Sequence, residues 1–306
     1  MIKRIAAIAL FSLIGIVGVA WIAGFLYTAD ASIPAGLPGT ITELDGIALR
    51  VLQEGTGSDI LMIHGSPGML EDFDAQAREL RTTHRVTRYD RPGHGFSGDG
   101  GRYSLAHNAR TALALIEKLG LERTVVVGHS YGGSTALALA QMKSPRVAAV
   151  VVVDSAVYQR IRPINPLYRL LRLPRFGLGL ARLVPRGRIE ATVAQSLAGE
   201  FKASAPSPQF TSLRTTVFSQ PKVLHAVANE HWDSDGELAR QSPGYGEIEI
   251  PVYIAAQADD PSRRATAEKL GKQIARAEVL LVPASGHYVQ VEQPAAITEL
   301  IRRAAD

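Results

Sequence analysis

Ser130 lies at the centre of the run Gly128-His129-Ser130-Tyr131-Gly132, which fits the pattern G-x-S-x-G. This spacing is typical of a serine nucleophile on a sharp turn between a strand and a helix, because the flanking glycines let the backbone pass closely there. The apolar residues 124–127 predict the strand, and the segment after the motif predicts the helix. The sequence therefore predicts that Ser130 presents its hydroxyl oxygen for nucleophilic attack.

A serine nucleophile needs a base, and His287 has the position for one. It closes the run Pro283-Ala284-Ser285-Gly286-His287, between an apolar strand predicted at residues 279–282 and the last predicted helix. A loop at that place can bring the imidazole back over the sheet. We therefore expect His287 to take the proton of Ser130.

Three aspartates are candidates for the carboxylate that orients this imidazole. Asp259 and Asp260 follow the strand predicted at residues 251–256, and Asp154 follows the one at residues 148–153. All three lie between the nucleophile and the histidine in the chain, an order that is known for serine nucleophiles on strand-to-helix turns. The expected acid position, after the later of the two strands, favours Asp260, with Asp259 and Asp154 as the alternatives.

Acyl transfer also needs hydrogen-bond donors for a developing oxyanion. The backbone N–H of Tyr131, directly after the nucleophile, is one candidate. The other is Ser66, in the loop His64-Gly65-Ser66-Pro67-Gly68, because Pro67 has no N–H to offer. We expect His64 to brace this loop through hydrogen bonds.

Short β-branched runs alternate with amphipathic segments over most of the chain, which predicts an α/β fold with a mostly parallel central sheet between helices. Ahead of the first of these runs, an Asp45-Gly46 turn predicts a hairpin. The alternation stops between residues 156 and 247, which we interpret as an inserted helical cap. The predicted core therefore consists of residues 31–155 and 248–306. The runs that predict strands are residues 60–63, 125–127, 148–153, 252–256 and 279–282, and those that predict helices are 70–80, 104–119, 134–143, 263–275 and 295–303.

Residues 1–30 differ from the rest. Lys3 and Arg4 precede an uncharged run over residues 5–28, long enough for a helix to cross a hydrocarbon core of roughly 30 Å. We expect a transmembrane anchor whose basic flank keeps the N-terminus in the cytoplasm and puts the catalytic part outside the inner membrane. A secreted protein, cleaved near Ala29-Asp30-Ala31, is the alternative.

The amino-acid composition excludes some kinds of site and partner. The chain has no cysteine, so disulfides and thiolate metal sites are absent, and its net charge of +4 comes without the basic and aromatic stripe of a nucleic-acid groove. The span 160–188 holds many arginines and no acidic residue, which indicates a solvated basic face or a membrane-surface element. We expect Glu230, Asp233, Asp235 and Glu237 to form a solvated loop.

These motifs together resemble the α/β-hydrolase superfamily, in the branch of epoxide hydrolases, haloperoxidase-like esterases, proline iminopeptidases and acylglycerol lipases. The segments that carry the resemblance, over residues 40–155 and 248–306, are His64 to Gly68, Tyr89 to Ser97, Gly128 to Gly133, and Gly286-His287 with Glu292 and Pro294. The resemblance implies a triad of Ser130, Asp260 and His287, oxyanion donors Ser66 and Tyr131, and no cofactor or metal. A serine at position 130 argues against the members that use an aspartate nucleophile.

The expected activity is hydrolysis of a small-molecule carboxylic ester through an acyl-serine intermediate. An amidase or iminopeptidase, or a cofactor-free perhydrolase or lyase on the same site, is the alternative. The motifs favour an ester or other acyl substrate and no nucleic acid, but substrate identity does not follow from the fold.

Overall fold

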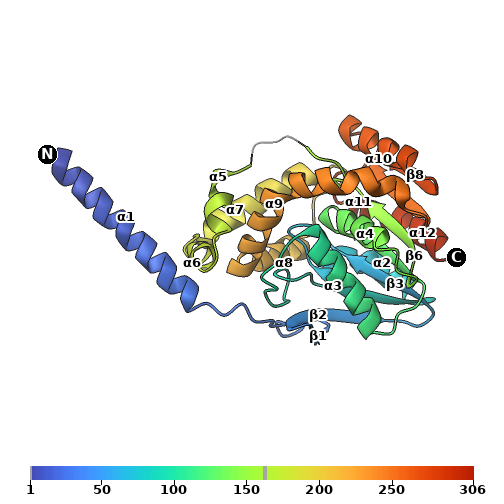
Figure 1. Ribbon diagram of the computed structural model, residues 1–306, viewed down its shortest axis with the longest axis horizontal. Coiled ribbons are helices and arrows are strands. Elements are labelled where there is room, and N and C mark those ends of the chain that lie inside the picture. Colours follow the sequence, from blue (N-terminus) through green and yellow to red (C-terminus); the bar gives the residue numbers. More distant parts are fainter. Residues whose placement is uncertain (1, 161–163) are drawn as a thin grey trace.

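The central sheet organises the molecule. A computed structural model describes residues 2–160 and 164–306 (Figure 1). In this part of the chain, eight strands form one sheet in the order β1-β2-β4-β3-β5-β6-β7-β8. Strand β1 pairs antiparallel with β2, and β2 with β4, whereas β4, β3, β5, β6, β7 and β8 are parallel. The strands are Thr40–Leu44 (β1), Ile47–Glu54 (β2), Ser58–Ile63 (β3), His84–Tyr89 (β4), Thr124–His129 (β5), Val147–Val153 (β6), Val252–Gln257 (β7) and Ala277–Val282 (β8).

The predicted strands and the Asp45-Gly46 hairpin turn are confirmed, but β4 was not predicted from the sequence. Four of its six residues are polar, and Arg88 pairs with Glu54 at 2.7 Å while Arg85 pairs with Asp59 at 2.5 Å. A strand whose polar side chains are paired in this way lacks the continuous apolar run of its neighbours.

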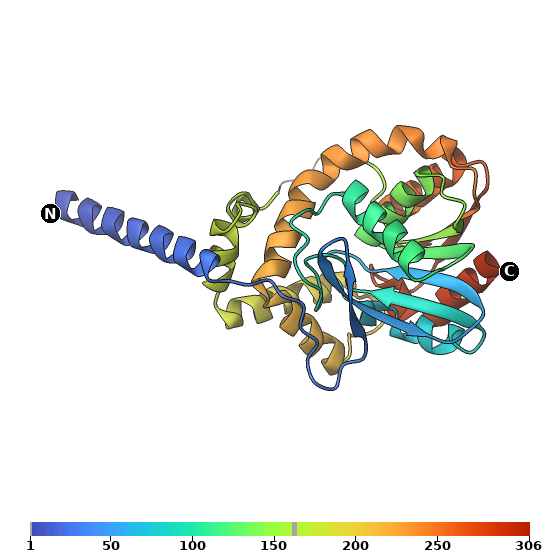
Figure 2. The ribbon, with the colours of Figure 1, turned by 60° about the horizontal axis from the view of Figure 1, so that its bottom comes forward.

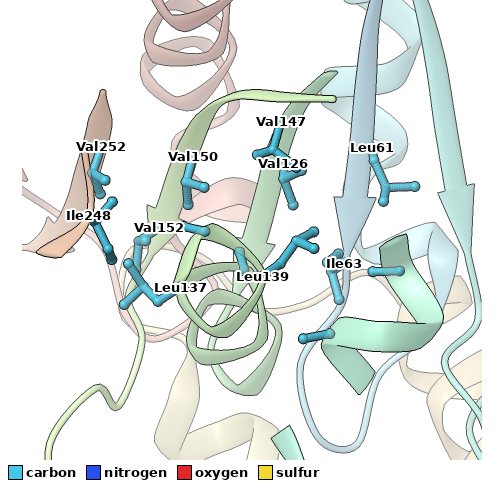
Figure 3. Close-up of a cluster of buried hydrophobic side chains, with 14 of the residues drawn as sticks. Leu61, Ile63, Val126, Leu137, Leu139, Val147, Val150, Val152, Ile248 and Val252 are labelled. Carbon is cyan, nitrogen blue, oxygen red and sulfur yellow. The ribbon is translucent and has the colours of Figure 1, made fainter. Parts of the chain in front are cut away.

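Helices cover both faces of the sheet. On one face, α3, α4 and α10 pack against strand residues such as Val126, Val150 and Val152 (Figure 3). On the other face, α2 and α12 pack against Ile60 and Val151. Burial of these apolar side chains is the main favourable term in the fold. These helices are Asp74–Leu80 (α2, after the 3₁₀ turn η1 at Leu70–Phe73), Leu105–Lys118 (α3), Tyr131–Gln141 (α4), Pro261–Gln273 (α10) and Pro294–Ala305 (α12), with the short Val289–Glu292 (α11) before α12.

The segment between β6 and β7 is helical where the structure describes it, and it lies over the carboxyl ends of the parallel strands (Figure 2). It has its own apolar cluster, in which Leu171, Ile189 and Leu197 pack against Tyr288 of the core. This agrees with the helical cap expected from the loss of alternation. The elements are Pro166–Leu171 (α5), Phe176–Arg182 (α6), Arg186–Glu200 (α7), Pro208–Phe218 (α8), Pro221–Gln241 (α9) and the 3₁₀ turn Ser242–Glu247 (η2).

The N-terminal helix α1, Ile2–Phe25, extends away from the body (Figure 1). Its last turns pack against α6, where Gly179 lies against the carbonyl of Ala20 and Gly24 lies against that of Arg175, so neither glycine leaves room for a Cβ. Across residues 2–160 and 164–306, no helix has both the length and the sustained apolar character needed to cross a membrane. The expected transmembrane helix is therefore not supported.

Candidate active site

Ser130 occupies the tight turn between β5 and α4. Its backbone has φ 53° and ψ −118°, a conformation that costs about 1–3 kcal/mol for a residue with a side chain. The turn closes because Gly128 lies against the backbone of Gly132, and Gly132 lies against the carbonyl of Ile63 on the neighbouring strand. The glycine spacing that identified the motif thus serves close backbone contact on both sides of the serine.

His287 lies within hydrogen-bonding distance of Ser130. The distance between its Nε2 and Ser130 Oγ is 3.0 Å, and its backbone N–H donates to the carbonyl of Glu200 on the cap at 2.6 Å. The structure therefore brings together the two residues that the sequence proposed as nucleophile and base. This geometry allows direct proton transfer between hydroxyl and imidazole.

Asp154, not Asp260, faces the other side of the imidazole. Its Oδ2 lies 2.6 Å from His287 Nδ1, and the side-chain amide of Gln257 donates to the same oxygen at 3.1 Å. Burial by itself would raise the pKa of Asp154, but the hydrogen bond and charge of His287, together with the charge of Arg263, lower it below the ordinary value. The carboxylate at the end of β6 therefore stays ionised beside the imidazole.

The prediction of Asp260 as this carboxylate is wrong. Asp260 is the N-cap of α10, where its Oδ1 accepts hydrogen bonds from the backbone N–H groups of Ser262 at 2.9 Å and Arg263 at 3.0 Å. Asp259, the first alternative, accepts the N–H of Ala284 at 3.0 Å. The sequence held a signal for the first role, because an aspartate directly before a proline is typical of an N-cap followed by proline at the first helical position.

The loop that carries Ser66 is braced from behind by buried polar groups. His64 Nδ1 lies 2.8 Å from the carbonyl oxygen of Gly65, and the backbone N–H of Arg91 donates to His64 Nε2 at 2.9 Å. Burial lowers the pKa of His64 well below its usual range, so the ring is neutral and can accept this bond. The expected bracing role of His64 is confirmed.

Both proposed oxyanion donors lie beside the nucleophile. Ser66 and Tyr131 line one cavity with Ser130 and His287. Tyr131 is the first residue of α4, and N–H groups in a first helical turn have no acceptor inside the helix. Their role as donors to an oxyanion stays a prediction.

A family model described as the alpha/beta hydrolase family matches residues 60–300. This chain belongs to the alpha/beta hydrolase family.

Among curated relatives of this hydrolase, Esterase Rv0045c of Mycobacterium tuberculosis is 26% identical over 295 residues, which cover 92% of the chain and 95% of the relative. Esterase YbfF of Escherichia coli K12 is 22% identical over 258 residues, which cover 80% of the chain and 92% of the relative. The solved structure of the enol-lactonase from Burkholderia xenovorans LB400 superimposes with a TM-score of 0.69 at 21% identity, covering 87% of this chain and 99% of that one. At such identity the structural likeness concerns the fold alone.

A buried ion pair ties the cap of the hydrolase to its core directly behind the Ser66 loop. Arg91 Nη1 lies 2.5 Å from Glu230 Oε1, and Nη2 of the same arginine donates to the carbonyl of Gly65 at 2.8 Å. Burial would raise the pKa of Glu230, but the charge of Arg91 lowers it to about 2. The expectation that Glu230 lies in a solvated loop is therefore wrong, since it is buried on helix α9.

Two further carboxylates fasten the cap to loops of the site. Arg214 on α8 pairs with Asp72 at 2.6 Å and donates to the carbonyl of Pro67, also at 2.6 Å. Glu292 joins the cap to the loop of residues 283–287, which carries His287. Its Oε2 accepts the N–H of Gly286 at 2.5 Å, and its Oε1 accepts the N–H groups of cap residues 202, 203 and 204. Sequence reasoning missed the Asp72 contact, because its partner is 142 residues away.

Two cavities meet at Ser130. The first, of about 310 Å³, is lined by polar and charged side chains that include Lys202, Asp235 and Arg263. The second, of about 150 Å³, lies under the cap and has a mainly apolar lining that includes Val193 and Leu197, with Arg214 and Glu200 among its polar residues. The site can therefore accept a molecule with one polar and one apolar part on either side of the reacting carbon.

Proposed function

We propose that this hydrolase cleaves a carboxylic ester through an acyl-serine intermediate, with Ser130 as nucleophile, His287 as general base and acid, and Asp154 as the orienting carboxylate. The observation that carries the proposal is the continuous contact from Ser130 Oγ through the imidazole to Asp154, at 3.0 and 2.6 Å. A serine that only shapes a turn needs neither contact. The esterase names of two curated relatives support the same class of reaction.

The reaction proceeds in two halves. In the first, Ser130 Oγ bonds to the ester carbonyl carbon while its proton moves to His287 Nε2, and that proton then passes to the departing alcohol as the carbon–oxygen bond breaks. In the second, His287 takes a proton from water, the water oxygen bonds to the acyl carbon, and the proton returns to Ser130 Oγ as the acid leaves. Ionised Asp154 stabilises the imidazolium in both halves.

The oxyanion formed in each half needs donors that are in place before the reaction. Under this proposal they are the N–H groups of Tyr131 and Ser66. The second donor sits on the loop that His64 and Arg91 brace, so its position does not depend on solvent. A single donor of this kind is worth about 10²–10³ in turnover in well-studied acyl-transfer enzymes.

The test is covalent labelling joined to turnover. The wild type and Ser130→Ala are treated with a fluorophosphonate probe, and both are assayed on p-nitrophenyl esters of increasing chain length and on matching anilides. We expect labelling and ester turnover for the wild type alone. Absence of labelling in the folded wild type would overturn the proposal, and labelling with anilide but no ester turnover would replace it with an amidase.

A further inference from the structure

The outer surface of the cap beside helix α1 carries apolar side chains that no part of the described chain covers. Four leucines are between 42 and 45% exposed: Leu167, Leu170, Leu173 and Leu183. They belong to α5, the turn after it, and the end of α6. With Arg169 and Arg175 they form what we call the cap face.

These leucines do not belong to the buried apolar cluster of the cap. Helix α5 already uses its inner side, where Leu171 is buried in the apolar cluster of the cap and Tyr168 lines the apolar cavity near Ser130. Leu167 and Leu170, one turn apart on the same helix, stay 42 and 45% exposed. Exposed leucines grouped in this way, rather than scattered singly, mark a binding surface.

The positive charge of the same region indicates an anionic partner. Residues 155–189 contain eight arginines and no acidic residue. Arg172 is paired with Asp233 and Arg186 with Glu190, but within the described residues no ion pair involves Arg169 or Arg175, and both are exposed. The guanidinium of Arg175 lies 5.9 Å from the ring centroid of Phe25 and still carries a charge that no acidic side chain in the described part of the chain neutralises. A surface of leucines with such arginines between them is complementary to anionic lipid headgroups above an acyl layer.

Helix α1 leaves the body beside this face and extends its apolar surface. Trp21 contacts Phe176 with ring centroids 6.0 Å apart, and Arg182 donates to the carbonyl of Ala23 at 3.3 Å. Beyond these contacts, Ile22 and Phe25 are 62 and 66% exposed. Figure 1 shows α5 and α6 at the side of the body from which α1 departs.

We propose that the cap face binds an anionic lipid surface, with α1 and the cap contacting the same layer. This inference concerns adsorption to a surface and makes no use of a membrane-spanning segment or of the proposed reaction. Each arginine near an anionic surface contributes about five-fold to partitioning at physiological salt. Loss of Arg169 and Arg175 together therefore corresponds to about 25-fold.

The experiment is flotation of the full-length chain with vesicles of phosphatidylcholine, alone or with phosphatidylglycerol, because aggregated protein sinks while bound protein rises. We expect the wild type to prefer the anionic vesicles. Arg169→Gln/Arg175→Gln should lose about 25-fold of anionic partitioning. The matched control is Lys118→Gln/Lys272→Gln, which removes the same charge from exposed ends of α3 and α10 and should float like the wild type.

A second variant, Leu167→Ser/Leu170→Ser, tests the apolar part and should weaken binding to both vesicle types. Unchanged melting temperature and fluorophosphonate labelling verify that each variant is folded. If the arginine variant floats like the wild type, α1 alone contacts lipid and the proposal is overturned. It is also overturned if the leucine variant floats normally but changes the oligomeric state in sedimentation velocity, because the cap face then binds a second copy of this chain.

Discussion

Replacing Asp154 by Asn tests whether His287 is oriented by Asp154, which lies beside it, or by Asp260, which the sequence favoured. Asp154 Oδ2 lies 2.6 Å from Nδ1, and an amide nitrogen at that place donates instead of accepting. The imidazole then turns to the tautomer that carries its proton on Nε2, facing Ser130 Oγ. In that form it cannot accept the serine proton.

The expected loss of turnover follows from this change of tautomer. The same replacement in a well-studied serine protease lowers turnover about 10⁴-fold, and we expect about 10³–10⁴-fold here. Asp260→Asn is the matched control, because asparagine caps a helix as well as aspartate does and can still accept from Ser262 and Arg263. This control should keep turnover within about threefold of the wild type.

The assay is steady-state hydrolysis of a p-nitrophenyl ester that the wild type turns over, with melting temperatures measured in parallel. A pH profile adds a readout that loss of structure does not mimic, since Asp154→Asn should recover part of its activity at high pH, where hydroxide can take the serine proton in place of the imidazole. Retention of more than a tenth of the activity by Asp154→Asn, or a thousand-fold loss in Asp260→Asn, would refute the assignment.

Three further predictions concern the cap and its attachments. Glu230→Leu leaves Arg91 as an uncompensated buried charge and should lower the unfolding free energy by about 3–5 kcal/mol, seen as a drop in melting temperature of roughly 10 °C, whereas adding Arg91→Met should restore part of it. Ser196→Trp, at the rim of the apolar cavity, should reduce turnover of long-chain esters about tenfold or more while acetate esters change little; equal loss on both would contradict an acyl pocket there. Burial lowers the pKa of Lys222 to about 8, so between that value and its ordinary pKa the unfolded chain binds more protons than the folded one. Urea unfolding should therefore show stability rising by about 1–2 kcal/mol from pH 7.5 to 9.5, and Lys222→Met should flatten that rise.

The sequence predicted most of the strands, and two residues of the proposed triad, because their signals are local. Runs such as Val125-Val126-Val127 are buried on both faces of the sheet, and Ser130 and His287 each follow a strand that ends in a turn. The family was recognisable from the same motifs. The location of the catalytic part outside the inner membrane stays a prediction.

The third residue of the proposed triad could not be chosen from the sequence, because aspartates follow two neighbouring strands. β6 and β7 pair in parallel, and acidic residues follow both, so chain order alone leaves three aspartates near the same edge of the sheet. Local geometry decides between them: Asp260 is used as a helix cap, while Asp154 has φ 41° at the end of β6 and lies beside the imidazole. The partners of Glu230 and Arg214 are likewise set by packing between distant segments.

The attachment of the cap has a consequence for building chimeric enzymes. Arg91 and Asp72 belong to the core, and their buried partners Glu230 and Arg214 belong to helices of the cap. A cap transplanted from a relative without these partners would leave Arg91 as a buried charge alone, at about 3–5 kcal/mol. Asp72, whose pKa burial raises to about 7, would be left without its hydrogen-bond partner. It would also release the loops that hold Ser66 and His287. Exchange of substrate range through this cap therefore requires that the two ion pairs and the contacts of Glu292 be moved as one unit.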